Sequence, residues 1–523
     1  MKPIYIILLL ATTLMLSSCS GLLDKEPDFV TPENYFKNEG EAMNSLNGVY
    51  NRLIDTYGRT YSRGLFSYLV LNDESYFKNI SINNIRVMTM DAADLDIGRF
   101  WEVLYEGVNR ANLLLENIDR VDMDVERRNA IKGEALFLRG YYYYLLVDFF
   151  GDVPLKLTAT KSPNDKYLTR ASMKEVYAQI VKDMTQAEGL VLSAPQLKYN
   201  ERVSKTAVQA VLARVFLKMA GEPLLDVARY EDAVVYADKV ISSGIHALNP
   251  DFKQIFINHS KDINDFKECL WEVGIYGNNI GNIEQAGMVG IENGIECPDE
   301  NIGYSGGGMR ITAKLYSLFG TKDTLRRDWS ISPYRYIVTN GATVKQVYNG
   351  QQIYDRNPGK WRREYELGAK ARSRNSTNFP IIRYSDVLLM KAEAENAIHG
   401  QPPTTAIDAV NQVRRRAFGK PVDVVNVNSD MPNNLDKVGF HQYIQDERMR
   451  EFCFEGLRRH DLIRWGIYVP VMNTLGKSIS TTAPAEHRYG GNAGLNTTER
   501  NVLFPIPNTE ITVNKLMTQN TGW

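Results

Sequence analysis

The stretch GEALFLRGYYYYLLVDFFGDVPL, residues 133–155, sets four consecutive tyrosines inside an otherwise apolar segment. Four adjacent rings can form a platform for a ligand, or they can belong to a buried core. Because each residue of an α-helix turns by about 100°, the rings of residues 141–144 point in four directions and cannot form one flat platform. Between residues 135 and 150 the only charged side chains are Arg139 and Asp148, so this helix is apolar on nearly all sides. We therefore predict a buried helix whose tyrosine hydroxyls bond to neighbouring helices.

Helix patterns also dominate the sequence on both sides of this stretch. Apolar residues recur at spacings of three and four in 100–119, 126–150, 172–191, 204–221, 229–244, 381–400 and 404–419. Ser172 with Glu175 three positions later is the pattern of a capping box. Pairs of helices of this length, with small residues at their contacts, fit degenerate tetratricopeptide-like units of about 34 residues. The fold class predicted is mostly α.

Two other regions differ in composition and in residue pattern. In the middle of the chain, about 245–380, Gly, Asn and Pro become frequent and short β-branched runs appear, such as ECLWEVGIYG at 268–277. This pattern predicts a loop-rich region with a few short strands between helical parts at about 98–244 and 381–523. Near the end, DERMREFCFEGLRRHDLIRWG (446–466) alternates charges with bulky apolar residues. We interpret it as a partly buried ion-pair network that fixes the geometry between subregions.

The first residues have the layout of a secretory signal. One Lys precedes an apolar run from Ile4 to Leu16, which is too short to span a bilayer as a stable helix. The ending Leu-Ser-Ser-Cys resembles the lipobox of bacterial lipoproteins, in which cleavage leaves Cys19 as the lipid-bearing N-terminus; a plain secreted protein is the alternative. We therefore expect a signal peptide at 1–18, a lipidated tether at 19–40 and a folded domain at 41–523.

Composition argues against several classes of protein and of site. The 61 basic and 62 acidic side chains leave a net charge of −1, so no strong field favours nucleic acid. Beyond Cys19, three cysteines allow at most one disulfide. The six histidines are scattered, without a His-x-x-x-His or Cys-x-x-Cys pair, so we expect no bound transition metal and no cofactor.

Six segments in order resemble the SusD/RagB family of Bacteroidetes outer-membrane lipoproteins. They are the opening stretch, TRASMKEVYAQIVKDM at 169, VSKTAVQAVLARVFLKMAGE at 203, FPIIRYSDVLLMKAEAENAIHG at 379, IQDERMREFCFEGLRRHDLIRWG at 444 and LFPIPNTEITVNKLMTQNTGW at 503. The resemblance implies four tetratricopeptide-like helix pairs supporting a variable, loop-rich region. It also implies capture of a nutrient, usually a glycan, at the outside of the outer membrane. The partner implied is a TonB-dependent transporter of the SusC type, on which such proteins act as a lid.

Two stretches have the composition of a sugar-binding surface, which needs exposed rings and planar polar groups. The first, 71–84, contains the loop that, by the family resemblance, often supplies stacking rings, although no Trp stands here. The second lies within 275–335. The ligand-binding residues predicted are Asp73, Tyr76, Phe77, Asn79, Tyr276, Asn278, Tyr304, Arg310 and Trp329.

Other functions remain as alternatives. The same lid could carry a non-glycan cargo such as a peptide. A hydrolase is a weaker alternative, because GYSGG at 303–307 matches the G-x-S-x-G nucleophile elbow but lacks the hydrophobic strand that should precede it. Glu447 and Glu451 could be read as a glycosidase carboxylate pair, although they lie in the charged segment interpreted above as structural. We predict a binding protein without catalytic residues.

Overall fold

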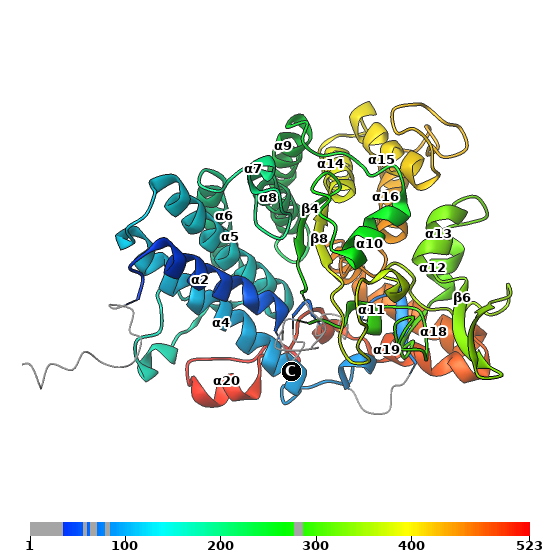
Figure 1. Ribbon diagram of the computed structural model, residues 1–523, viewed down its shortest axis with the longest axis horizontal. Coiled ribbons are helices and arrows are strands. Elements are labelled where there is room, and N and C mark those ends of the chain that lie inside the picture. The colour runs from blue at the N-terminus through cyan, green and yellow to red at the C-terminus, as the bar shows by residue number, and fades with distance from the viewer. Residues whose placement is uncertain (1–34, 56–59, 63–70, 79–83, 277–285) are drawn as a thin grey trace, which may run out of the picture.

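A computed structural model of the chain describes residues 35–55, 60–62, 71–78, 84–276 and 286–523 (Figure 1). The long helices are α2 (Glu39–Tyr50), α4 (Leu95–Asn117), α5 (Val125–Phe150), α6 (Met173–Glu188), α8 (Lys205–Ala220), α9 (Arg229–Ser242), α14 (Tyr384–Ile398), α15 (Thr404–Ala417), α16 (Lys437–Phe452) and α18 (Tyr468–Thr482). The shorter ones are α7 (Ala194–Leu197), α10 (Phe252–Lys261), α11 (Val289–Glu292), α12 (Ala313–Leu318), α13 (Thr324–Ser330), α17 (Arg458–Arg464), α19 (Asn492–Asn496) and α20 (Asn508–Val513). Within the described residues, no helix is both long and apolar enough to cross a bilayer.

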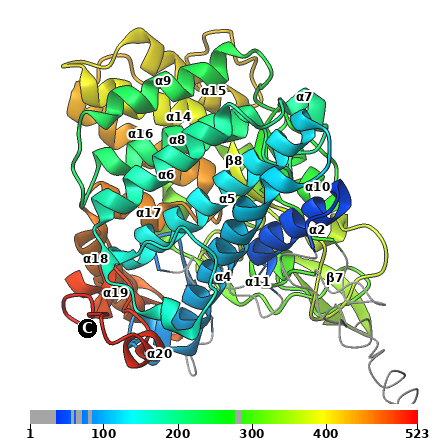
Figure 2. The same cartoon turned by 90° about the vertical axis from the view of Figure 1, so that its left-hand side faces the viewer.

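Successive long helices pack against one another in a row. Helix α4 packs on α5, α5 on α6, α6 on α8, and α8 on α9. The row then crosses a large gap in the sequence, because α9 also packs on α14, and α14 packs on α15 and α16. Figure 2 shows α4, α5, α6, α8 and α9 side by side along this row. The arrangement confirms the predicted mostly α fold of packed helix pairs.

Local sequence signals explain where several of these helices begin. At the start of α6, the Ser172 side chain accepts from the Glu175 backbone N–H, and the Glu175 carboxylate accepts from the Ser172 N–H at 2.8 Å, which confirms the capping box. The side chains of Asp94, Asp124 and Ser204 cap α4, α5 and α8 in the same way. Each of these acceptors satisfies backbone donors that a helix N-terminus leaves without intrahelical partners.

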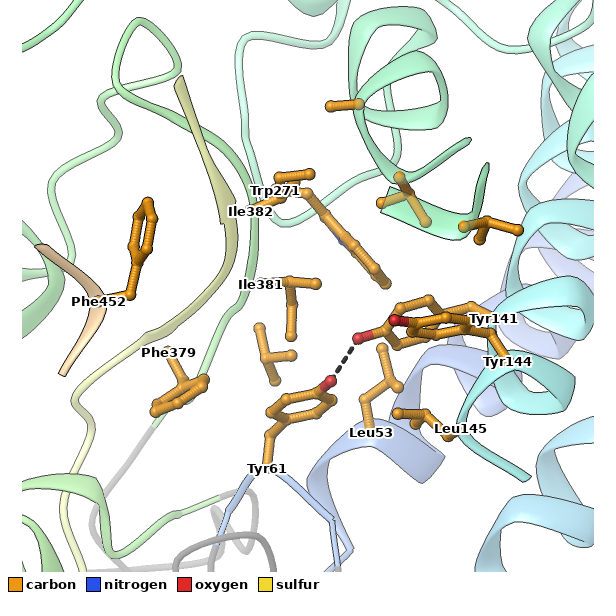
Figure 3. Close-up of a cluster of buried hydrophobic side chains, with 14 of the residues drawn as sticks. Leu53, Tyr61, Tyr141, Tyr144, Leu145, Trp271, Phe379, Ile381, Ile382 and Phe452 are labelled. Atoms are coloured by element: carbon orange, nitrogen blue, oxygen red, sulfur yellow. Dashed lines mark hydrogen bonds between the residues drawn. The ribbon is translucent and has the colours of Figure 1, made fainter. Parts of the chain in front are cut away.

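The four tyrosines lie in the core, as predicted. Side chains 141–144 in α5 are at most 6% exposed. The Tyr142 hydroxyl donates to the Val49 carbonyl of α2 at 2.6 Å, and the Tyr141 hydroxyl bonds to that of Tyr61 (Figure 3). One of these two partners lies in a neighbouring helix and the other in a connecting segment. The opening stretch therefore organises the core and is not a ligand platform.

In the part of the chain that the structure describes, the short strands form four two-stranded antiparallel sheets. Their pairs are β1 (Ser75–Phe77) with β5 (Met309–Ile311), β2 (Val153–Pro154) with β3 (Arg170–Ala171), β4 (Cys269–Val273) with β8 (Phe379–Arg383), and β6 (Tyr334–Thr339) with β7 (Ala342–Val347). Strand β4 falls within the predicted run at 268–277. Trp271 of β4 meets the Tyr141 ring edge-on at 4.8 Å, so this strand shares the core of the helix row (Figure 3).

One predicted helix begins later than its pattern indicated. The helix expected at 381–400 starts at Tyr384, because residues 379–383 form strand β8. Pro380 has no N–H to donate and biases the residue before it toward extended backbone. The β-branched Ile381 and Ile382 then favour a strand over a helix. The apolar spacing alone could not separate these two states.

The charged segment near 446–466 forms the predicted ion-pair network, and it is deeply buried. Arg383 of β8 contacts Glu268 at 2.8 Å, Glu451 of α16 at 3.0 Å and Glu455 at 2.8 Å. All four side chains are at most 4% exposed. Arg326 of α13 and Arg416 of α15 also contact Glu451. Arg326 extends the network to Glu447 of α16, which pairs in turn with Arg414 and Arg450. The network ties the strand pair β4–β8 to the late helices.

Candidate functional site

The two stretches predicted to bind ligand are hydrogen-bonded neighbours. Strand β1 comes from the first stretch and β5 from the second, with Tyr76 opposite Arg310 and Phe77 opposite Met309. Beyond the strand end, the Lys78 backbone N–H donates to the Gly308 carbonyl at 2.7 Å. The structure thus brings together two segments that are more than 200 residues apart. Their role in binding stays a prediction.

Asp73 is buried in ion pairs. Its carboxylate accepts from the Arg458 Nε at 2.8 Å and contacts the Lys314 Nζ at 2.5 Å. Burial alone would raise the pKa of Asp73, but these two positive charges outweigh it and hold the pKa below its usual range. This carboxylate therefore links the segment before β1 to α17. The expectation that it lies at an open surface is wrong.

The two aromatic side chains of β1 are also covered. The Tyr76 ring is 4% exposed, its hydroxyl donates to the Tyr354 carbonyl at 3.1 Å, and it lies 3.0 Å from the His487 Nδ1. The Phe77 ring is 3% exposed, with the Arg86 guanidinium 3.8 Å from its centroid. The expectation of exposed stacking faces is wrong for both rings, because Tyr354 and His487 cover Tyr76 and Arg86 covers Phe77.

Two residues of the second stretch are buried as well. Arg310 is 3% exposed and pairs with Glu296 at 2.9 Å. Trp329 is 5% exposed, with the Arg362 guanidinium 3.9 Å from its ring centroid. Both side chains therefore stabilise the loop-rich region and present no open face for a sugar ring.

Tyr276 and Tyr304 keep surface that a ligand can reach. Tyr276 is 65% exposed. Tyr304 is half-buried, and the Arg372 guanidinium lies 4.0 Å from its ring centroid. The remaining predicted residues, Asn79 and Asn278, lie outside the described residues, as does the lipidation site Cys19.

Tyr276 borders a hollow of about 420 Å³ beside the end of α2 and the end of β4. The Tyr50 ring also lines it. Its planar polar side chains are Asn47, Asn51, Glu201, Arg202, Asp262 and Glu272. An exposed ring beside amides, carboxylates and a guanidinium is the combination that can stack on a sugar face and bond to its hydroxyls. Sequence reasoning found only Tyr276, because the other residues come from three separate segments without a shared motif.

The electrostatics of the hollow are mainly acidic. Burial, followed by the negative charge of Glu272, raises the pKa of the Glu201 carboxyl to about 7. Near neutral pH this group is therefore protonated in part of the molecules and can donate as well as accept a hydrogen bond. Arg202 is already bound to Glu134, with 2.6 Å between Nε and a carboxylate oxygen. Its charge is thus largely compensated by the buried Glu134.

The residues behind the catalytic alternatives have structural roles. Ser305 of the GYSGG segment lies in an isolated bridge with Cys297, and its hydroxyl donates to the Ile291 carbonyl at 2.9 Å. This is not the strand-to-helix turn of a nucleophile elbow. Glu451 is fully buried; burial alone would raise its pKa, but the charges of neighbouring arginines, Arg416 foremost, lower it to about 2. A general acid needs the opposite shift.

Sequence comparisons cover both halves of the chain. A model described as "SusD family" matches residues 293–523, and a model described as "Starch-binding associating with outer membrane" matches residues 22–217. A SusD-like protein of Formosa agariphila is 24% identical, over 96% of this chain and 95% of its own. The starch-binding protein SusD of Bacteroides thetaiotaomicron is 24% identical, over 80% of this chain and 76% of its own.

Solved structures agree over nearly the full length. A SusD homologue from Bacteroides thetaiotaomicron superposes with a TM-score of 0.84 at 27% identity, covering 94% of this chain and 98% of its own. A structure named as a laminarin-binding SusD-like protein has a TM-score of 0.71 at 21% identity, covering 93% of this chain and 100% of its own. The second likeness shows the shared fold alone.

Proposed function

The chain belongs to the SusD/RagB family, and from this we propose that it binds a glycan at the cell surface and passes it to a transporter. The observation that carries the proposal is the full-length likeness to SusD structures, joined to the hollow beside Tyr276. The hollow offers an exposed ring and convergent planar groups, which is the chemistry that recognises pyranose faces and hydroxyls.

We propose that the binding surface is built from the hollow and from the surface around Tyr304. Residues buried in β1 and β5 would then support this surface and not stack on the ligand themselves. This division assigns contact to Tyr276, Asn47, Asn51 and Glu201, and support to the paired strands. A bound sugar that donates a hydroxyl to Glu201 would be held best when that carboxyl is ionised.

The cellular setting is part of the same proposal. Residues 1–18 would be removed as a signal peptide, Cys19 would carry the lipid, and residues 19–40 would tether the domain 41–523 to the outer membrane, facing outward. A multiply acylated cysteine holds a protein stably on a bilayer, since each buried methylene contributes roughly 0.8 kcal/mol. Replacing Cys19 with Ala should release the protein from membranes or leave the precursor uncleaved, which fractionation and fatty-acid labelling would detect.

Delivery requires a membrane partner, and we propose a TonB-dependent barrel of the SusC type. Purification of the membrane-bound protein under mild detergent should bring down a large outer-membrane receptor in stoichiometric amount. Recovery of the protein alone, from membranes in which such a receptor is expressed beside it, would contradict the lid role. Glycan binding by the isolated protein would be unaffected by that outcome.

Binding of cargo is tested by titrating the purified protein calorimetrically with a panel of neutral and charged polysaccharides, and with peptide mixtures as a second arm. We expect heat from at least one polysaccharide, and chromatography should return that polysaccharide at its original length. Binding confined to the peptides would favour the alternative cargo. Shortened glycan products would instead show a hydrolase.

A further inference from the structure

Three side chains with different ligand atoms meet next to the hollow. They are His259 near the end of α10, and Cys269 and Glu272 of β4. One nitrogen, one sulfur and one oxygen from them all lie within 4.8 Å of one another, and each side chain is about 2% exposed. The histidine is ten residues before the cysteine, so the sequence contains no recognisable metal motif.

A shift in the register of strand β4 brings these three side chains together. In a regular strand, residues three apart point to opposite faces, so Cys269 and Glu272 would be separated by the sheet. The pairing of β4 with β8 shifts register on both sides of Trp271. Such irregularities re-aim side chains, and here they place the thiol and the carboxylate on the same side as His259.

The ligand atoms of Cys269 and His259 make few hydrogen bonds. The Cys269 thiol has Trp271 O at 3.6 Å and Ile382 O at 4.0 Å as weak acceptors, and it also hydrogen-bonds to the Glu272 carboxylate. The His259 Nδ1 finds no hydrogen-bond partner within the described part of the chain, and its Nε2 lies 3.3 Å from Glu272. A fully buried thiol and imidazole with so few contacts have capacity for another bond.

The carboxylate of Glu272 is oriented but not neutralised. One oxygen accepts from the Asn378 amide at 2.9 Å, and the same amide nitrogen donates to Asp262 at 3.0 Å. Among described residues, His259 is the one basic side chain within 4 Å of Glu272. Asp262 and Glu201 place two more carboxyl groups nearby, so carboxyl groups outnumber the basic side chain paired with Glu272, an imbalance that a divalent cation would relieve.

We propose that His259, Cys269 and Glu272 form a Zn²⁺ site. Imidazole, thiolate and carboxylate are the ligand types that zinc accepts together, whereas Mg²⁺ and Ca²⁺ require oxygen. Binding would release the thiol proton to solvent, and the two negative ligands would then match the charge of the ion. Asn378 would act as an outer-shell residue that holds the Glu272 carboxylate in place.

The position of the site gives the ion a role. Glu272 lines the hollow, whereas His259 and Cys269 are not among its lining residues, and a water from the hollow would take the fourth coordination position. The ion would link the end of α10 to β4, the strand that leads to Tyr276. It would thus stiffen one wall of the proposed glycan site without itself contacting the sugar. The site does not depend on what the hollow binds.

The experiment strips the purified protein of metal with a chelator and reloads it with Co²⁺, whose bond to a thiolate gives a charge-transfer absorption band in the near ultraviolet. We expect one Co²⁺ per chain with this band, displaced by Zn²⁺, and a melting temperature that rises with Zn²⁺. The Cys269→Ser variant should lose the band and should bind Zn²⁺ more weakly by well over the roughly 10–100-fold typical of losing an outer-shell partner.

Cys297→Ser is the matched control, because Cys297 is also a free thiol with 2% exposure in the loop-rich region. It should keep the band and the Zn²⁺-dependent rise in melting temperature. If Cys269→Ser does not fold, Glu272→Gln, which keeps an acceptor for Asn378, should weaken Zn²⁺ binding while retaining the thiolate band. A folded parent protein without the band, or a band that survives in Cys269→Ser, would overturn the proposal.

Discussion

The helix row and the junction between the loop-rich region and the late helices are stabilised by different means. From α4 to α9, buried apolar side chains and tyrosines fill most contacts between regular helices, with buried ion pairs such as Arg139–Asp183 and Lys218–Asp148 among them. Around β4, β8 and α16, a network of buried arginines and carboxylates is added to the apolar packing, with Arg383 reaching Glu268, Glu451 and Glu455. Repeating helices can register through periodic apolar faces, whereas irregular segments have no such period. Directional ion pairs can supply the missing register, which explains why the network lies where the helices give way to loops.

The largest effect should come from breaking the network at Arg383. Replacing it with Met leaves three buried carboxylates facing one another without their shared cation. Breaking a buried pair typically costs about 3–5 kcal/mol, so we expect a loss of at least this size in the free energy of unfolding, or no folded protein at all. Urea denaturation followed by tryptophan fluorescence measures it.

The control is Arg372→Ala, which removes a pair with Glu300 whose side chains are 61% and 51% exposed. Exposed pairs contribute about 0–1 kcal/mol, so this variant should unfold nearly as the parent does. Equal stability losses in the two variants would show that burial of the network does not matter. The proposed contrast between the two regions would then fail.

A somewhat smaller loss of stability is expected when the apolar core of the helix row is disturbed. The Tyr142 ring packs so closely on Gly107 of α4 that an added Cβ there would lie 2.5 Å from a ring carbon. Tyr142→Ala should therefore cost about 3–5 kcal/mol through the cavity that it leaves. Tyr142→Phe keeps the ring and should cost only about 1 kcal/mol for the bond to Val49. Glycan affinity of the folded protein should not change, and a stable Ala variant that had lost binding would contradict the core assignment.

The two adjacent carboxyl groups just before β1, those of Asp73 and Glu74, make stability depend on pH in a way that can be measured. Burial raises the pKa of Glu74 to about 8, whereas Asp73 beside it is held ionised by Arg458. A pKa raised on folding contributes stability that is complete below the unfolded value of about 4.5 and is lost as pH rises through about 8. Asp73, with its lowered pKa, is ionised in both states across this window and adds no slope.

Glu74→Gln keeps a neutral group in the same place. The variant should therefore gain stability relative to the parent as pH rises from about 5 to 8, by at most about 1.4 kcal/mol per pH unit. Denaturation at several pH values measures the free energy of unfolding of both proteins. Subtracting one from the other removes the contribution of the titrating groups that they share. Parallel profiles for parent and variant would mean that Glu74 is ionised in the folded state.

The same contrast explains what the sequence could reveal. Helices α4, α5, α6, α8 and α9 follow from local apolar spacing and caps, and the buried tyrosines follow from the absence of a polar face on α5. Strand β8 could not be separated from the helix behind it, because its apolar residues fit both patterns. The partner of β1 could not be predicted at all, since pairing with β5 is decided by tertiary contacts between distant segments.

The candidate site was harder to predict for the same physical reason. The composition of 71–84 is that of an exposed ligand surface, yet Tyr76 is covered by Tyr354 and His487, which lie hundreds of residues away. Exposure depends on such partners and leaves no mark in the local sequence. The hollow beside Tyr276 likewise combines three separate segments. The zinc ligands meet only because of an irregularity in β4, which residue spacing alone does not reveal.

The smallest effect should appear at the surface itself, where neither apolar core nor ion network is touched. Tyr276→Ala removes an exposed ring, and stacking of one ring on one sugar face should contribute about as much as an aromatic pair, roughly 0.5–1.5 kcal/mol. Affinity for the glycan found in the panel should then fall by about tenfold at most, with unchanged unfolding. A double variant with Tyr304→Ala should lose nearly all binding. Tyr167→Ala is the control, because Tyr167 is 46% exposed but does not line the hollow. If the double variant binds like the parent in calorimetric titration, the glycan surface lies elsewhere on the loop-rich region.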